Sequence, residues 1–246
     1  MKRLTGTKQW APINENCFKG CQNLCKYCYG KKNAIRFKRK TEENWHIMEY
    51  NPNCESHIRK RKGRIMFPTT HDLHIQHADW WMPFIRGLLE KGNDILIVSK
   101  PQPAAIRKIC HELRGYKDQI EFRFTIGTED DKVRAFWEPG APPILERVSA
   151  LNHAHRAGFR TSVSMEPLLD FDPTPTITLL DPMVSETFWI GTMNHMSITE
   201  FKSEELSWYH RMRAINSLNN ITHIYEKFKD NPKVCWKDSI QRMLKL

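Results

Sequence analysis

The chain has 246 residues, of which 40% are hydrophobic and 27% charged, and this size predicts one α/β domain over residues 1–246 with a substantial core. No apolar run approaches the roughly 20 residues that a membrane-spanning helix needs, and residues 1–10 are too polar for a secretory signal. We therefore expect a cytoplasmic protein that spans no membrane. The formal net charge is +10, so the location of the cations along the chain bears on the choice of partner.

The excess positive charge belongs to the first quarter of the chain. Residues 1–64 hold 16 Lys or Arg against 5 Asp or Glu, a net charge of +11, whereas the remainder holds 22 against 23, a net charge of −1. The densest runs are residues 31–40 and 59–64, within an insertion of about residues 31–64. Such runs form either a solvated face or a phosphate-contacting rim, and the second alternative predicts binding to DNA or RNA.

Predicted strands and helices alternate along most of the chain. We expect strands near 10–14 and at 64–70, 94–100, 120–128, 159–169, 186–192 and 233–237. We expect helices at 78–92, 103–115, 142–158 and about 206–228, with a terminal helix after the last strand. The continuous apolar run at 94–100 is typical of a strand buried on both faces of a parallel sheet.

Six or seven βα units predict an α/β fold. Right-handed crossovers favour a partial (β/α)6-type parallel barrel, an incomplete TIM barrel, over a flat doubly wound sheet, with a short strand and helix in a C-terminal extension at about 230–246. In both architectures ligands bind at the carboxyl ends of the strands. Polar residues gather there: residues 69–72, 99–100, 125–129, 166 and 191–194.

The chain has seven cysteines, at positions 17, 21, 25, 28, 54, 110 and 235. An odd number with this uneven spacing indicates metal-binding thiolates in a reducing compartment, not a disulfide framework. Cys25 and Cys28 form the single CxxC pair. Adding Cys17 and Cys21 gives four ligands, so one alternative is a zinc-binding, non-catalytic nucleic-acid-binding module. Three thiolates on a cubane cluster would instead leave one iron open for a reaction.

The spacing Cys21-x3-Cys25-x2-Cys28, with Tyr27 before the last cysteine, resembles the radical S-adenosylmethionine (SAM) signature. The longer string NCFKGCQNLCKYCYG, within a cluster loop at 17–30, is similar to the spore photoproduct lyase-like branch and to related phage-encoded radical SAM proteins. The resemblance implies that Cys21, Cys25 and Cys28 hold one [4Fe-4S] cluster whose fourth iron binds SAM. It also implies reductive SAM cleavage to a 5′-deoxyadenosyl radical, with flavodoxin or ferredoxin as reductant.

The same resemblance implies contacts to SAM that follow the strand order. Those expected to bind SAM or to lie beside it are Tyr27, Thr70, Asp72, Ser99, Lys100, Thr125 and Glu166. Spore photoproduct lyase needs a hydrogen-donating cysteine after the second strand, and residues 66–72 contain none. This absence argues against thymine-dimer repair, unless Cys235 approaches the cavity from the C-terminal tail. The substrate, the product and the fate of SAM stay undetermined, and the basic first quarter favours a nucleic acid.

Three histidines, His71, His74 and His77, recur every third residue and could suggest a second metal. They span a predicted strand-to-helix turn, so we expect them to pack and cap there. Cys110 lies on the apolar face of a predicted helix and is expected in the core.

Overall fold

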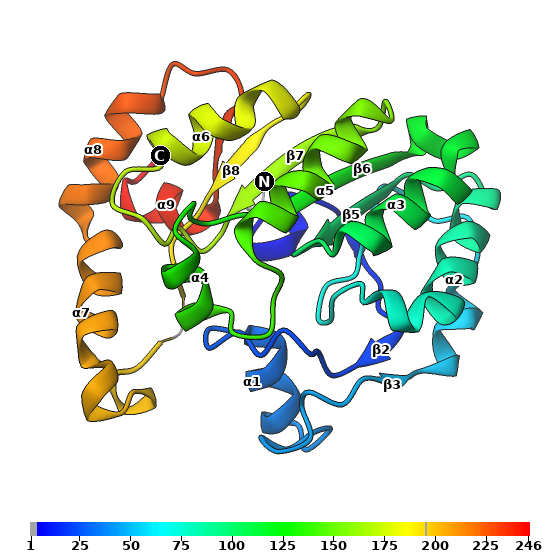
Figure 1. Cartoon of the computed structure of the whole chain (residues 1–246), viewed down its shortest axis with the longest axis horizontal. Coiled ribbons are helices and arrows are strands. Elements are labelled where there is room, and N and C mark those ends of the chain that lie inside the picture. The colour runs from blue at the N-terminus through cyan, green and yellow to red at the C-terminus, as the bar shows by residue number, and fades with distance from the viewer. Residues whose placement is uncertain (1–3, 195) are drawn as a thin grey trace.

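A computed structural model describes residues 4–194 and 196–246 (Figure 1). Seven parallel strands form one sheet in the spatial order β1-β4-β5-β6-β7-β8-β9. Their bounds are Ile13–Asn14 (β1), Ile65–Phe67 (β4), Ile95–Ser99 (β5), Ile120–Thr125 (β6), Arg160–Met165 (β7), Phe188–Ile190 (β8) and Val234–Trp236 (β9). The order follows the chain without reversal, whereas a doubly wound sheet reverses at a switch point. The partial parallel barrel predicted from the sequence is therefore confirmed.

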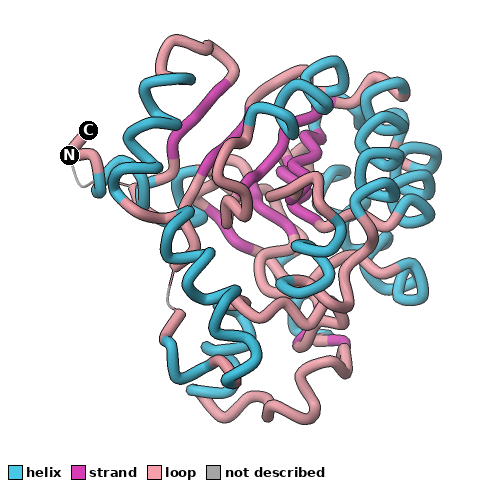
Figure 2. Tube along the Cα trace, turned by 60° about the vertical axis from the view of Figure 1, so that its left-hand side comes forward, coloured by secondary structure: helices cyan, strands magenta, loops and turns pink. Residues whose placement is uncertain are grey.

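Helices lie around the outer side of the curved sheet, and the strands pass through the middle of the molecule (Figure 2). The longer ones are α2 (Ala78–Glu90), α3 (Pro103–Glu112), α5 (Ile144–Arg156), α6 (Thr174–Leu180), α7 (Leu206–Ile215) and α8 (Leu218–Phe228), and α9 (Asp238–Met243) follows the last strand. None of the helices in the described ranges is long and apolar enough to cross a membrane.

A second, smaller group of elements lies below the sheet in Figure 1. It contains helix α1 (Tyr29–Arg36) and the antiparallel pair β2 (Phe18–Lys19) and β3 (Glu49–Tyr50). These elements belong to the cysteine segment and the basic insertion. Helix α4 (Asp131–Trp137) lies between them and the later strands.

Side chains on the two faces of the sheet have different partners. Outward-facing Ile97, Phe122 and Val163 are fully buried in the main core. The inner face is mixed, because Leu96 packs with Met66 whereas β6 directs charged groups inward. A barrel interior with both apolar and charged groups is suited to a polar ligand, because the charged groups can bind its polar atoms while the apolar side chains pack against the rest.

The predicted strands all appear, and the differences concern helices, the end of one strand and one additional strand pair. The expected helix at 206–228 is two helices, because Ser217 caps a new helix by accepting a hydrogen bond from the amide of Asn220 at 3.3 Å. The strand expected to reach residue 169 ends at Met165, ahead of the cis peptide between Glu166 and Pro167. Helices α1, α4 and α6 and the β2–β3 pair were not predicted, because they are short or rich in charged residues.

Candidate functional site

The cysteine loop is fixed to the basic insertion by its backbone. The amide of Cys21 donates to the carbonyl of Trp45 at 2.9 Å. Gly20 has a φ of +96°, and a Cβ there would lie 2.3 Å from the carbonyl oxygen of Ile47, so this position requires glycine. At the other end of the loop, Cys28 is the N-cap of α1, and its Sγ accepts from the amide of Lys31 at 3.3 Å.

The thiols of Cys21, Cys25 and Cys28 influence one another. Burial is the largest cause for all three, and it raises the pKa of Cys25 to about 12 and those of Cys21 and Cys28 above their usual value. Cys25 and Cys28 also raise the pKa of Cys21, and the Lys100 ammonium partly offsets burial at Cys25 and Cys28. A metal would have to displace protons from these thiols, and the nearby cation would favour the thiolates.

The donor set suits an iron–sulfur cluster. Three thiols come from one loop, and thiolates are the ligands that iron–sulfur clusters use. Within residues 4–194 and 196–246, no three His, Cys, Asp or Glu side chains are arranged as a complete ligand group. The fit therefore rests on the chemistry of the thiols and their shared surroundings.

The Cys17 side chain contacts His71. It is fully buried, its Sγ lies 3.8 Å from Nε2 of His71, and burial first and the neighbouring Cys54 thiol second raise its pKa. Its amide donates to Nε2 of His71 at 3.2 Å. This placement is unfavourable for the zinc alternative, which needs Cys17 beside Cys21.

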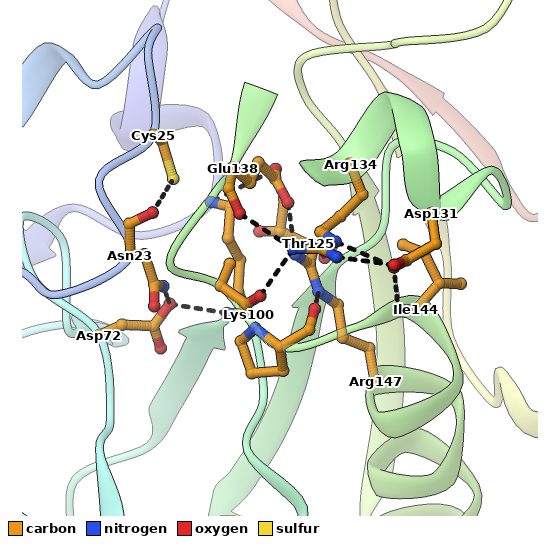
Figure 3. Close-up of polar contacts among 12 residues, drawn as sticks. Asn23, Cys25, Asp72, Lys100, Thr125, Asp131, Arg134, Glu138, Ile144 and Arg147 are labelled. Carbon is orange, nitrogen blue, oxygen red and sulfur yellow. Dashed lines mark hydrogen bonds and ion pairs between the residues drawn. The ribbon is translucent and has the colours of Figure 1, made fainter. Parts of the chain in front are cut away.

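Asp72 joins three loops at the carboxyl edge of the sheet (Figure 3). Its Oδ2 accepts from Nδ2 of Asn23 at 2.7 Å and from the amide of Lys100 at 2.9 Å. Its Oδ1 accepts from the amide of Leu73 at 2.8 Å and from Oγ of Ser99. Both oxygens are thus occupied by protein donors, so this carboxylate positions the cysteine loop against β4 and β5.

A second carboxylate, that of Glu138, lies on the other side of Lys100 (Figure 3). It pairs with Nη2 of Arg147 at 2.5 Å, lies 3.9 Å from Nζ of Lys100 and accepts from the hydroxyl of Tyr27. Burial disfavours its ionisation, but Arg147 and then Lys100 outweigh burial and hold the pKa of Glu138 below its usual value. The cluster loop is thereby joined to α5 through Tyr27.

The Lys100 side chain is 14% exposed and lies beside the cysteines, and among the described residues it has one long ion pair. Its Nζ lies 5.5 Å from the ring centroid of Tyr27 and 3.9 Å from Glu138. Burial disfavours the charged form, yet Cys25, Glu138 and Asp72 together raise the pKa of Lys100 above its usual value. An ammonium with spare donors in this position can accept a carboxylate ligand.

The remaining predicted residues surround the same edge. The amide of Thr70 donates to Oδ1 of Asn16 at 2.8 Å, and Thr125 lies on the inner face with its carbonyl accepting from Nη1 of Arg147 at 3.1 Å. The carboxylate of Glu166 lies 3.4 Å from Nζ of Lys237. Their contacts with SAM stay predictions.

The sequence did not single out several residues that the structure places around this edge or in the barrel interior: Asn16, Asn23, Arg123, Glu138, Arg147 and Lys237. One signal was available, because Arg147 lies three, four and seven residues before Ala150, Leu151 and Ala154 on the buried face of α5. A charged residue at that position predicts a buried acidic partner. The sequence does not reveal that the partner is Glu138.

Two tryptophans, Trp10 and Trp189, pack against Arg123 in the barrel interior. The guanidinium carbon of Arg123 lies 5.0 Å from the ring centroid of Trp10 and 5.3 Å from that of Trp189. Nε of Arg123 donates to Oγ of Ser162 at 3.0 Å and its Nη2 to Glu121 at 2.7 Å. Cys235 lies beside Trp189 in the sheet register, so it belongs to this interior and not to the outer core.

No protein-family model matches the chain. The uncharacterized protein ORF301 of Acidianus two-tailed virus is 26% identical over 163 residues, which are 61% of this chain and 53% of that protein. The chain thus spans about half the length of the curated relative it matches.

Solved structures match over almost the whole chain. A mutant of spore photoproduct lyase with dinucleoside spore photoproduct has a TM-score of 0.55 at 14% identity, covering 95% of this chain and 78% of that one. The chain has the fold of spore photoproduct lyase. SuiB of Streptococcus suis bound to S-adenosylmethionine matches with a TM-score of 0.55 at 9% identity, covering 92% of this chain and 50% of that one. The resemblance of the cysteine string to radical SAM proteins is thus confirmed at the level of the fold.

Proposed function

We propose that the chain is a radical SAM enzyme with one [4Fe-4S] cluster on Cys21, Cys25 and Cys28. The observation that carries the proposal is the placement of these three thiols on one loop, at the carboxyl edge of a spore photoproduct lyase fold, beside the Lys100 ammonium. The cluster would supply the electron that reductively cleaves SAM to a 5′-deoxyadenosyl radical, which abstracts hydrogen from the substrate.

The protein's own groups would bind and orient SAM. Lys100 is suited to pair with the SAM carboxylate, because its ammonium has donors to spare next to the cysteine loop. Thr70, Ser99, Thr125 and Glu166 lie at the same edge of the sheet and are proposed to contact the ligand. Asp72 and Tyr27 are proposed to act beside it, because their polar atoms already hold the loops in place.

For the substrate we favour a nucleic acid. The first quarter of the chain carries the excess positive charge, and it forms the elements next to the cysteine loop. A reductant such as flavodoxin or ferredoxin would supply the electron. The reaction that follows is proposed to be of the lyase or transferase type.

Anaerobic reconstitution with iron and sulfide tests the proposal. We expect a brown protein that releases 5′-deoxyadenosine from SAM under dithionite. Single Ala substitutions of Cys21, Cys25 and Cys28 should abolish the release, whereas Cys17→Ala should keep the brown colour, because Cys17 lies beside His71. A colourless wild-type protein with stoichiometric zinc and no SAM cleavage would contradict the proposal.

A further inference from the structure

Several cations of the two dense basic runs already form ion pairs within the molecule. Lys31 pairs with Glu42, Lys32 with Glu200 at 2.7 Å and Lys40 with Glu49 at 2.7 Å. In the second basic run, Arg61 pairs with Glu15 and Arg64 with Glu121. The two dense runs are therefore not one continuous free rim.

Four consecutive exposed residues at the end of α1 differ from this pattern: Arg36, Phe37, Lys38 and Arg39, here called the Phe37 patch. In the described ranges, no acidic side chain pairs with its three cations. The Phe37 ring is 58% exposed, and the guanidinium carbons of Arg36 and Arg39 lie 5.6 and 5.5 Å from its centroid. The patch thus joins an open aromatic surface to three unpaired cations.

The end of α1 holds the patch in a fixed conformation. The amide of Lys38 donates to the carbonyl of Ile35 at 2.9 Å and that of Arg39 to the carbonyl of Ala34 at 2.8 Å, which is the Schellman pattern. Lys38 occupies the left-handed position of this motif with a φ of 53°, where glycine is the favoured residue. Lys38 therefore adopts a backbone conformation that is strained for a residue with a Cβ.

We propose that the Phe37 patch binds single-stranded nucleic acid, with a base stacked on Phe37 and flanking phosphates contacting Arg36, Lys38 and Arg39. Stacking on an aromatic ring beside cations is how proteins hold unpaired bases. The proposal rests on the proposed function for the site that the strand would reach. Along α1, about 14 Å separate Cys28 from Phe37 at roughly 1.5 Å per residue, the length of about four stacked nucleotides at roughly 3.4 Å each.

The test measures binding of the full-length reconstituted chain to a fluorescent single-stranded oligonucleotide across a salt series, by anisotropy. We expect Phe37→Leu to weaken affinity by about tenfold, because stacking of a base on an aromatic side chain is worth that much or more. Lys38→Gly should lower the slope of log affinity against log salt by roughly 0.7. This variant also relieves the strained backbone, so its melting temperature should stay equal to or above that of the wild type.

Phe171→Leu is the matched control. Phe171 is 42% exposed and carries the Arg211 guanidinium at 5.2 Å, but it lies in the loop after β7. Its substitution should leave affinity unchanged. An oligonucleotide with 2-aminopurine should be quenched by the wild type and less by Phe37→Leu.

Two outcomes would overturn the proposal: unchanged binding by Phe37→Leu and Lys38→Gly, or a polyglutamate peptide that competes as well as the oligonucleotide at equal charge. The second outcome would indicate an acidic peptide as the ligand. Release of 5′-deoxyadenosine without substrate is measured in parallel, and Phe37→Leu should retain it. A protein that cleaves SAM but binds no oligonucleotide would therefore refute nucleic-acid binding by the Phe37 patch. The proposed radical chemistry would still hold.

Discussion

Asp72 accepts hydrogen bonds from the cysteine loop, from the loop after β4 and from the end of β5, through Asn23, Leu73 and Lys100. This makes it the residue whose charge state and shape fix the cysteine loop most directly. The resemblance of the sequence to radical SAM proteins predicted that Asp72 lies near SAM. The contacts indicate a positioning role, since no oxygen of the carboxylate is left without a donor.

The substitution Asp72→Asn keeps the shape of the side chain. It replaces one accepting carboxylate oxygen with an NH2 group, which then faces other hydrogen-bond donors. We expect a loss of about 1–3 kcal/mol in the free energy of unfolding, because buried polar groups lose their partner. Iron and sulfide bound per chain after anaerobic reconstitution should also fall. Asp230→Asn, at an exposed position, is the control and should change neither quantity. Full cluster loading with wild-type stability in Asp72→Asn would contradict the positioning role.

His71 supports a prediction about pH. Its Nε2 accepts from the amide of Cys17, so the ring is neutral in the folded protein, and burial lowers its pKa to about 4. In the unfolded chain the ring titrates near 6.5. The unfolded state then binds more protons between these values, so stability is complete above about pH 6.5 and falls as the pH drops toward 4, by about 3 kcal/mol in total.

His71→Gln removes the titration and retains an acceptor and a donor. We expect the difference in unfolding free energy between wild type and variant to change across pH 4.5 to 7, measured by urea denaturation at each pH. A difference that is constant with pH would show that His71 does not carry this titration.

At the scale of elements, the alternation of strands and helices could be predicted because each signal is local. Apolar runs such as 94–100 and helical periodicity such as 78–92 depend on neighbours a few residues away. The contacts that build the site could not be predicted in this way. Glu138 meets Tyr27 across 111 residues, and Asn23 meets Asp72 across 49, so both depend on how the elements pack.

The loop between α4 and α5 packs backbone to backbone against the cysteine loop. The amide of Gly140 donates to the carbonyl of Asn23 at 3.0 Å, and a Cβ at Gly140 would lie 2.1 Å from the carbonyl oxygen of Gln22. A methyl group there has to push the two loops apart. This contact is an element-scale requirement for glycine that no local pattern reveals.

Gly140→Ala should therefore destabilise the protein by about 1–3 kcal/mol and reduce iron binding, because backbone cannot give way as a flexible side chain does. Urea denaturation and iron content measure the two effects. Gly115→Ala is the matched control, since a Cβ at Gly115 meets no atom within 4 Å. Equal behaviour of the two variants would mean that the loops are free to separate.

At the scale of the whole molecule, the N-terminal segment is joined to the residues after the last strand. The amide of Gly6 donates to Oδ1 of Asp238 at 3.1 Å, and Nζ of Lys237 donates to the carbonyl of Gly6 at 2.7 Å. The same ammonium lies 4.1 Å from the ring centroid of Trp10 and 3.4 Å from Glu166. A partial barrel leaves β1 and β9 as sheet edges, and these contacts link the two sides.

Lys237→Met tests whether this link stabilises the barrel. The methionine retains the apolar stem but leaves Glu166 without its cation and Gly6 without its donor, so we expect a loss of about 2–4 kcal/mol in the free energy of unfolding. Adding Glu166→Gln should recover part of the loss, because the uncompensated charge is removed. Lys233→Met is the control, since Lys233 pairs with Asp181 at 2.8 Å on the surface, where such pairs contribute about 0–1 kcal/mol. If both single variants unfold at the same urea concentration, the contacts between the two ends do not close the barrel.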